Sequence, residues 1–205
     1  MWDLALGAYP SVIALQGVVG LEESDRWYRD ELPRWLASRM PPFLRAAELV
    51  HVVEWKMRRG EWLGRNLALA KRNSAKRVET ATAEAFRMVP QIRPAIDRIG
   101  ELEGVGPATA SAVLAAFRGD LYPFLDDVIG RAIPELGTPK FTALYYVGYS
   151  EALRGKAQVL GSPWTAQGVG LALWAAAGGK VGLSPAARDS DLVLPDLIER
   201  LTAPQ

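Results

Sequence analysis

The sequence predicts an all-α protein, a helical array without strands. Three observations lead to this fold class. Apolar residues recur with a helical period in most segments. Capping residues and prolines separate these segments. No stretch alternates apolar and polar residues as a half-buried strand does. We expect about nine or ten helices in a single domain over residues 1–205.

Four helices are expected in the first half of the chain. Pro33 marks a local break or a helix start in the first of them. Gly60 is a C-cap of the second, and Ser74 is an N-cap of the fourth. These helices cover residues 22–39, 44–59, 65–71 and 74–88.

The second half begins with a pair of helices, the hairpin unit, over residues 92–117. Thr138 and Pro139 predict an N-cap and a first helical position further on. Two more helices are expected over residues 141–156 and 165–177. The tail, residues 178–205, is rich in Gly, Pro and Asp, with one short amphipathic piece near 192–201.

Composition narrows the class of protein. The chain is 49% hydrophobic and 23% charged, which is ordinary for a globular protein. It has no apolar run long enough for a membrane span. The opening residues lack a basic region, so we expect no signal peptide and a cytoplasmic, intracellular protein. The absence of cysteine excludes disulfides and cysteine-ligated iron–sulfur clusters.

The most informative segment is Leu-Glu-Gly-Val-Gly-Pro-Ala-Thr-Ala, residues 102–110. Gly104 and Gly106 allow positive φ and close backbone approach. Pro107 suits the first position of a helix. Such a turn exposes backbone N–H groups at a helix start, where they can hold a phosphate. Alternatively, the glycines only form a C-cap and a tight turn that packs two helices together.

Beyond this segment, Asp126 follows, with Arg131 five residues later. At these residues the chain resembles the helix-hairpin-helix DNA glycosylase superfamily, which includes endonuclease III and the adenine and alkyladenine glycosylases. The resemblance covers roughly residues 96–131. It implies two helical lobes around a cleft. It also implies contacts to DNA by the hairpin residues Gly104, Val105, Gly106, Ala108 and Thr109.

The resemblance also implies a catalytic carboxylate. Asp126 matches the aspartate of the family, and its neighbour Asp127 is the alternative. A carboxylate there would stabilise the oxocarbenium-like sugar formed when an N-glycosidic bond breaks. Without catalysis, both acids are simply favourable at a helix N-terminus.

Two further expectations come from the same resemblance. Members of the family with lyase activity place a Schiff-base lysine where this chain has Ala108, so the resemblance implies a monofunctional enzyme. Hairpins of the family often hold a monovalent cation, K⁺ or Na⁺, on backbone carbonyls. By position these carbonyls belong to Gly100, Leu102 and Val105. No cofactor is required.

The net charge is only +1, but its distribution is uneven. Residues 56–77 hold eight basic side chains against Glu61 alone, which suits either a DNA-facing surface or a solvated helix face. The DNA-binding candidates outside the hairpin are Lys56, Arg58, Arg59 and Arg131. Candidates for a pocket that receives an extruded base are Glu54, Trp55, Tyr122, Tyr145 and Tyr146. The one histidine, His51, lies in an apolar run and is expected to be structural.

Together these features predict a monomeric protein that binds double-stranded DNA, associates with the nucleoid and has no membrane partner. The leading interpretation is a monofunctional DNA glycosylase that excises a damaged or modified base. The first alternative is a helix-hairpin-helix protein that recognises DNA structure or damage without cutting. The second is a helical scaffold.

Overall fold

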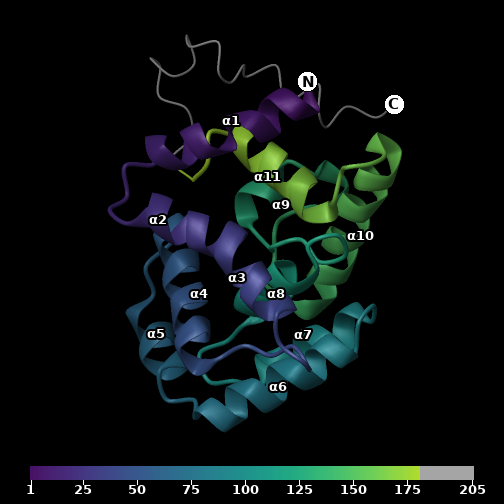
Figure 1. Cartoon of the computed structure of the whole chain (residues 1–205). Coiled ribbons are helices and arrows are strands. Elements are labelled where there is room, and N and C mark those ends of the chain that lie inside the picture. The colour runs from purple at the N-terminus through teal and green to yellow at the C-terminus, as the bar shows by residue number, and fades with distance from the viewer. Residues whose placement is uncertain (181–205) are drawn as a thin grey trace.

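The structure is a computed structural model that describes residues 1–180, and the segment expected near 192–201 lies outside them. The described residues form helices and no strands, so the all-α prediction is confirmed. They contain eleven α-helices (Figure 1), slightly more than expected. None of these helices has the length and hydropathy that crossing a membrane requires.

The bounds of the α-helices are α1 (Trp2–Leu15), α2 (Leu21–Arg26), α3 (Leu32–Ala37), α4 (Ala46–Arg59), α5 (Gly64–Ala70), α6 (Ala75–Arg87), α7 (Ile92–Gly100), α8 (Pro107–Arg118), α9 (Asp127–Arg131), α10 (Ala143–Leu160) and α11 (Ala166–Ala176). A π-helical turn, Trp27–Glu31, joins α2 to α3, and a 3₁₀ turn, Pro134–Leu136, follows α9.

Local sequence signals explain several helix boundaries. The Ser74 hydroxyl accepts a hydrogen bond from the Arg77 N–H at 3.3 Å, as its N-cap role predicts. Of the two alternatives for Pro33, the helix start is the one found, because Pro33 occupies the first turn of α3, directly after the π-helical turn. Pro107 is the first residue of α8, as expected.

One predicted helix start is wrong. Helix α10 begins at Ala143, and its N-cap is Thr142, which accepts from the Tyr145 N–H at 3.2 Å. The residues expected to start this helix, Thr138 and Pro139, lie in the loop before it. Pro139 packs against Gly130 of α9, where an added Cβ would lie 3.1 Å from its ring. Pro139 therefore packs against α9 instead of starting α10.

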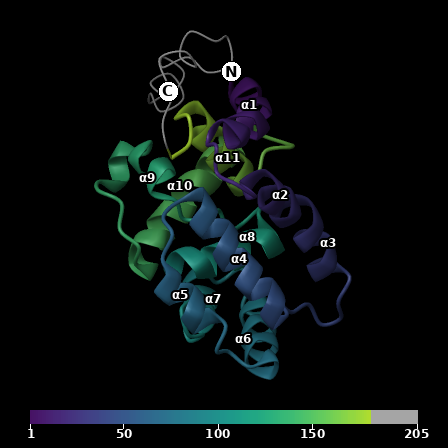
Figure 2. The same cartoon turned by 90° about the vertical axis from the view of Figure 1, so that its left-hand side faces the viewer.

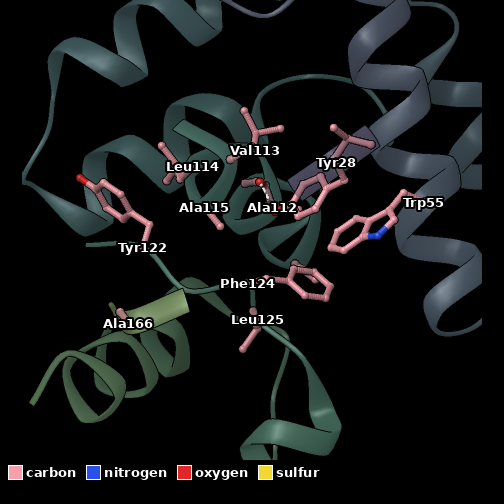
Figure 3. Packing of buried hydrophobic residues seen from close by; sticks show 14 of the residues in the cluster. Tyr28, Trp55, Ala112, Val113, Leu114, Ala115, Tyr122, Phe124, Leu125 and Ala166 are labelled. Carbon is pink, nitrogen blue, oxygen red and sulfur yellow. Dashed lines mark hydrogen bonds between the residues drawn. The ribbon is translucent and has the colours of Figure 1, made fainter. Parts of the chain in front are cut away.

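Helix α8 lies at the centre of the fold (Figure 1). Residues 108–116 are all buried, and most of them are alanines, so α3, α4 and α7 can pack closely against it. Figure 3 shows Val113 and Leu114 of this helix among buried residues, with Tyr28 and Trp55 on one side and Tyr122 on the other. The Tyr28 hydroxyl donates to the Ala112 carbonyl at 2.7 Å.

Helices from the two ends of the described chain lie side by side. Helix α1 packs along α11, and both lie at the opposite end of the molecule from α6 and α7 (Figure 1). The Gln16 amide, just after α1, donates to the Gly178 carbonyl at 3.1 Å. The segment after α11 is therefore held against the first helix.

The α7–α8 turn, residues 101–106, is fixed from one side. The Asn73 side chain donates to the Glu103 carbonyl at 2.9 Å and accepts from the Glu103 N–H at 3.0 Å. Gly104 has φ +75° and lies against the backbone of α5. Gly106 has φ −95° and ψ 180°, an extended conformation open to any residue. Within this turn, Gly104 is therefore the glycine whose conformation requires positive φ.

We predict that Gly104→Ala destabilises the protein and that Gly106→Ala does not. A Cβ at Gly104 would lie 2.4 Å from the Asn66 carbonyl oxygen and 2.8 Å from the Ala70 nitrogen. With the positive φ, this should cost about 2–4 kcal/mol in the free energy of unfolding. A Cβ at Gly106 meets no atom within 4 Å, so its cost should be about 1 kcal/mol or less. Urea denaturation of both variants measures the difference, and equal losses would contradict the packing role of Gly104.

Candidate functional site

A cavity of about 350 Å³ lies where the C-terminus of α4, the N-terminus of α8 and the start of α9 meet. In Figure 2, α4 and α5 face the viewer and α9 lies to their left. The cavity walls come from segments that are far apart in sequence. The lining residues include Lys56, Arg59, Glu61, Leu63, Asn66, Gly106, Ala108, Thr109, Phe124, Asp126, Asp127, Phe141 and Lys180.

The N-terminus of α8 opens into this cavity. Residues 106–109 line it, and Gly106, the N-cap, has no side chain to bond the first N–H groups of the helix. Gly106 is exposed, whereas Ala108 and Thr109 are buried. Free N–H groups at a helix start favour an anion, because the helix dipole adds to their donor capacity.

Leu102 and Val105 of the expected hairpin do not line the cavity. The Val105 N–H donates to the Leu102 carbonyl at 3.2 Å. The Leu102 carbonyl is one of those expected to hold a monovalent cation, with the carbonyls of Gly100 and Val105. This cation site stays a prediction.

Asp126 is the buried carboxylate of the cavity. Its Oδ1 accepts from the Val128 N–H at 2.8 Å, so Asp126 is the N-cap of α9. Its Oδ2 lies 3.3 Å from Nε of Arg59. Burial raises the pKa of Asp126 above its usual value, and the positive charge of Arg59 opposes this shift.

Asp127 is more exposed, and two cations compensate its charge. Nζ of Lys180 lies 2.9 Å from its Oδ2, and Nη2 of Arg131 lies 2.6 Å from the same atom. Arg131 was expected to contact DNA, and its side chain is exposed but joined to Asp127. Both acids line the cavity, so the geometry does not choose between them by position alone.

Lys56 is the one lysine among the expected site residues. It lines the cavity from α4, and burial lowers its pKa while the charge of Asp126 opposes that shift. Ala108, at the position where the resembled family can place a lysine, lines the cavity but has no amine in its side chain.

The expectation that Arg59 contacts DNA phosphates is corrected. Arg59 is only 2% exposed, because four aromatic rings and a tyrosine hydroxyl enclose its guanidinium. Arg58 is half-buried, with its guanidinium beside Gly20. The exposed basic residues of the 56–77 zone are Arg65, Lys71, Arg72, Lys76 and Arg77, of which Arg72 and Arg77 pair with Glu103.

The predicted set of base-pocket residues is also corrected. None of its five residues lines the cavity. Trp55, Tyr122 and Tyr146 are fully buried core side chains. Tyr145 packs its hydroxyl against Gly130, and Glu54 lies half-buried on α4. Figure 3 shows Trp55 beside Tyr28, and their rings stack with centroids 3.6 Å apart.

The aromatic side chains that do line the cavity are Phe124 and Phe141. Phe141 is 54% exposed, and Trp62, in the loop between α4 and α5, is 55% exposed. Sequence reasoning missed Phe141 and Lys180. Phe141 was expected at the start of a helix over residues 141–156, and it lies instead in the loop before α10.

His51 does not belong to the site. Its ring stacks on Trp27 with centroids 3.7 Å apart, and burial lowers its pKa. This half-buried position agrees with the structural role predicted for it. Within residues 1–180, no three His, Asp or Glu side chains gather as a metal-binding group.

The cavity therefore joins four kinds of group: helix N-terminal donors, a buried carboxylate, a partly buried amine and two aromatic residues, of which Phe141 is exposed and Phe124 is buried. This combination suits a ligand with an anionic part and an aromatic part. No protein-family model, curated protein or solved structure matched the chain in comparisons with each.

Proposed function

We propose that this protein binds double-stranded DNA and hydrolyses the N-glycosidic bond of a damaged or modified base, as a monofunctional DNA glycosylase. One observation carries the proposal: the N-terminus of α8, after the Gly104–Gly106 turn, and the carboxylate of Asp126 line the same cavity. In the resembled helix-hairpin-helix family these two features sit at the mouth of a cleft between two lobes. The proposal extends that arrangement to this chain.

In this proposal the N–H groups at the start of α8 hold one phosphate of the duplex. Neighbouring phosphates would meet exposed cations of the 56–77 zone, including Arg65 and Lys71. A monovalent cation on the hairpin carbonyls would add a further positive charge. The protein would act as a monomer in the compartment that holds DNA.

Asp126 then supplies the chemistry. As the base departs, positive charge develops on the sugar, and a carboxylate close to it lowers the energy of that state. The same carboxylate can orient the attacking water. Because Asp126 is buried, its charge acts in a medium of low dielectric, where electrostatic stabilisation is stronger than in water.

The edge of the cavity suits a base that has left the helical stack. Phe124 and Phe141 provide aromatic faces within the wall, and an extruded base stacks readily on such faces. Trp62 is an exposed aromatic residue in the loop that contributes Leu63 to the wall. An apolar side chain in this place can fill the gap that the base leaves.

A second candidate is a protein that recognises DNA structure without cutting it. It is favoured by one observation, that Asp126 caps α9 and faces Arg59, which gives the carboxylate a structural role. Duplexes bearing different lesions, each scored for abasic-site formation, separate the two candidates. Release of any base supports the glycosylase, and duplex binding without release supports the second candidate.

We predict that Gly106→Asp weakens binding to duplex DNA at least about tenfold, about 1.4 kcal/mol, while the fold is retained. Aspartate is a good N-cap and fits the extended backbone here, but its charge would occupy the place of the phosphate. Gly106→Asn is the matched control, since it caps without charge. Titration of labelled duplex at two salt concentrations measures the effect. Equal affinities of wild type and Gly106→Asp would exclude a phosphate at α8.

Asp126→Asn should lower the rate of base excision at least about a hundredfold and leave DNA binding unchanged or tighter. Asparagine retains the cap on α9, so the fold should persist. Single-turnover excision on a duplex that wild type cleaves at the glycosidic bond gives the rate. Asp127→Asn is the neighbouring control and should stay active. If Asp127→Asn alone is inactive, Asp127 is the catalytic acid.

The product should be an abasic site in an intact strand, which breaks only after alkali or heat. The hairpin offers no amine, because Ala108 replaces the lysine of lyase members. Gel analysis with and without alkali tests this. Borohydride trapping of a protein–DNA adduct would contradict it, and loss of that adduct in Lys56→Ala would identify Lys56 as the nucleophile.

A further inference from the structure

Arg59 is a buried cation in the wall of the cavity. It ends α4 and is 2% exposed. Its guanidinium carbon lies 4.3 Å from the ring centroid of Trp174 and 5.3 Å from that of Phe124. The rings of Tyr9 and Trp55 lie at 5.5 and 5.7 Å. These cation–π contacts offset part of the cost of burying the charge.

One side of the guanidinium is anchored through α1 and α2. Nη1 of Arg59 donates to the Tyr9 hydroxyl at 2.8 Å, and that hydroxyl donates to Oδ1 of Asp25 at 2.8 Å. Asp25 is itself buried and also accepts from Nε1 of Trp55 at 3.0 Å and Nε of Arg29 at 2.7 Å. Arg59 is therefore fixed in place by a chain of hydrogen bonds.

The other donor nitrogens of Arg59, Nε and Nη2, are not anchored by such hydrogen bonds. Nε lies 3.3 Å from Oδ2 of Asp126. Within the described residues, neither Nε nor Nη2 has a hydrogen-bond partner, although both atoms are buried. Leaving buried charged donors unsatisfied is costly. A fold that keeps this arrangement places a fixed positive charge next to one carboxylate that faces the cavity.

We propose that Arg59 is the positioning residue for Asp126, and that it holds this carboxylate ionised and oriented for the base-excision step. The proposal rests on the function proposed above. Arg59 does not contact the DNA. It acts through Asp126, and the Tyr9–Asp25 chain holds Arg59 itself.

The electrostatic reason is that burial alone would favour a neutral Asp126. Burial raises its pKa, and Arg59 is the strongest opposing influence. The hydroxyl of Tyr149 lies close by and donates to the Phe124 carbonyl at 2.7 Å. The charged and titratable groups around Asp126 are Arg59 and Lys56 of α4, Asp127 of α9, Tyr149 of α10 and Lys180.

The sign of the pH effect follows from these charges. Excision requires the carboxylate, so the rate falls as pH drops through the pKa of Asp126. Removing the positive charge of Arg59 raises that pKa further. In Arg59→Met the acid limb of the pH–rate profile should therefore move up by at least about one pH unit. The rate at high pH should recover, because Asp126 is then ionised again.

Single-turnover excision is measured across pH on the duplex whose lesion wild type releases fastest. Arg59→Lys keeps the charge, and its acid limb should lie within about half a unit of wild type. A purely structural role for Arg59 predicts a loss of rate that is similar at every pH. An unshifted acid limb in folded Arg59→Met would overturn the proposal.

A measurement on the protein alone covers the case in which Arg59→Met fails to fold. Infrared titration of wild type minus Asp126→Asn isolates the carboxyl band of Asp126. The proposal requires this carboxyl to be ionised at pH 7, and a protonated carboxyl there would overturn it. If wild type releases no base from any duplex, the proposed function fails, and the infrared result still reports whether Asp126 is ionised beside Arg59.

Discussion

The close packing of α8 is the constraint on which the rest of the structure depends. Residues 108–116 are buried on every side of this helix, and their small side chains let α3, α4 and α7 approach its backbone. An interior packed in this way transmits any displacement to its neighbours. The N-terminus of α8 is therefore held rigidly at the wall of the cavity. The core composition thus fixes where the backbone donors of residues 106–109 lie.

The packing of the core also determines which charged groups lie at the cavity. Isolated buried charges are expensive, and a pair is tolerated only where its hydrogen-bonding groups and neighbours compensate it. Three hydrogen-bond donors compensate the buried charge of Asp25. Four aromatic rings and the Tyr9 hydroxyl compensate that of Arg59. Helix α1 contributes Tyr9 to this set although it does not line the cavity. The electrostatics of Asp126 therefore depend on helices remote from it in sequence.

Features set by local chemistry could be predicted from the sequence. The fold class, the cap at Ser74 and the helix start at Pro107 all follow from residues within one helical turn of each other. The spacing from Gly104 to Asp126 also led to Asp126, which lines the cavity together with Gly106. The N-cap of α10 was expected at Thr138 and lies instead at Thr142, while Pro139 packs against Gly130 of α9.

Features set by contacts between distant segments could not be predicted. Arg59 belongs to a basic run, and its charge suggested a surface position. Its burial depends on Tyr9, Phe124 and Trp174, which come from three other parts of the chain. The prediction of the base-pocket residues was wrong for the same reason. Trp55 and Tyr146 belong to the core, whereas Phe141 lines the cavity. One signal existed for Arg59: it lies one turn after Trp55 on the same face of α4.

The two glycines of the α7–α8 turn help to distinguish a helical scaffold from a binding site. Packing explains Gly104, because its positive φ and its contact with α5 exclude a side chain. Packing does not explain Gly106, whose backbone is extended and whose Cβ position is empty. A serine or aspartate at this N-cap would stabilise α8 slightly more than glycine does. Glycine there leaves the first N–H groups of α8 without a side-chain cap, as the proposed phosphate site requires.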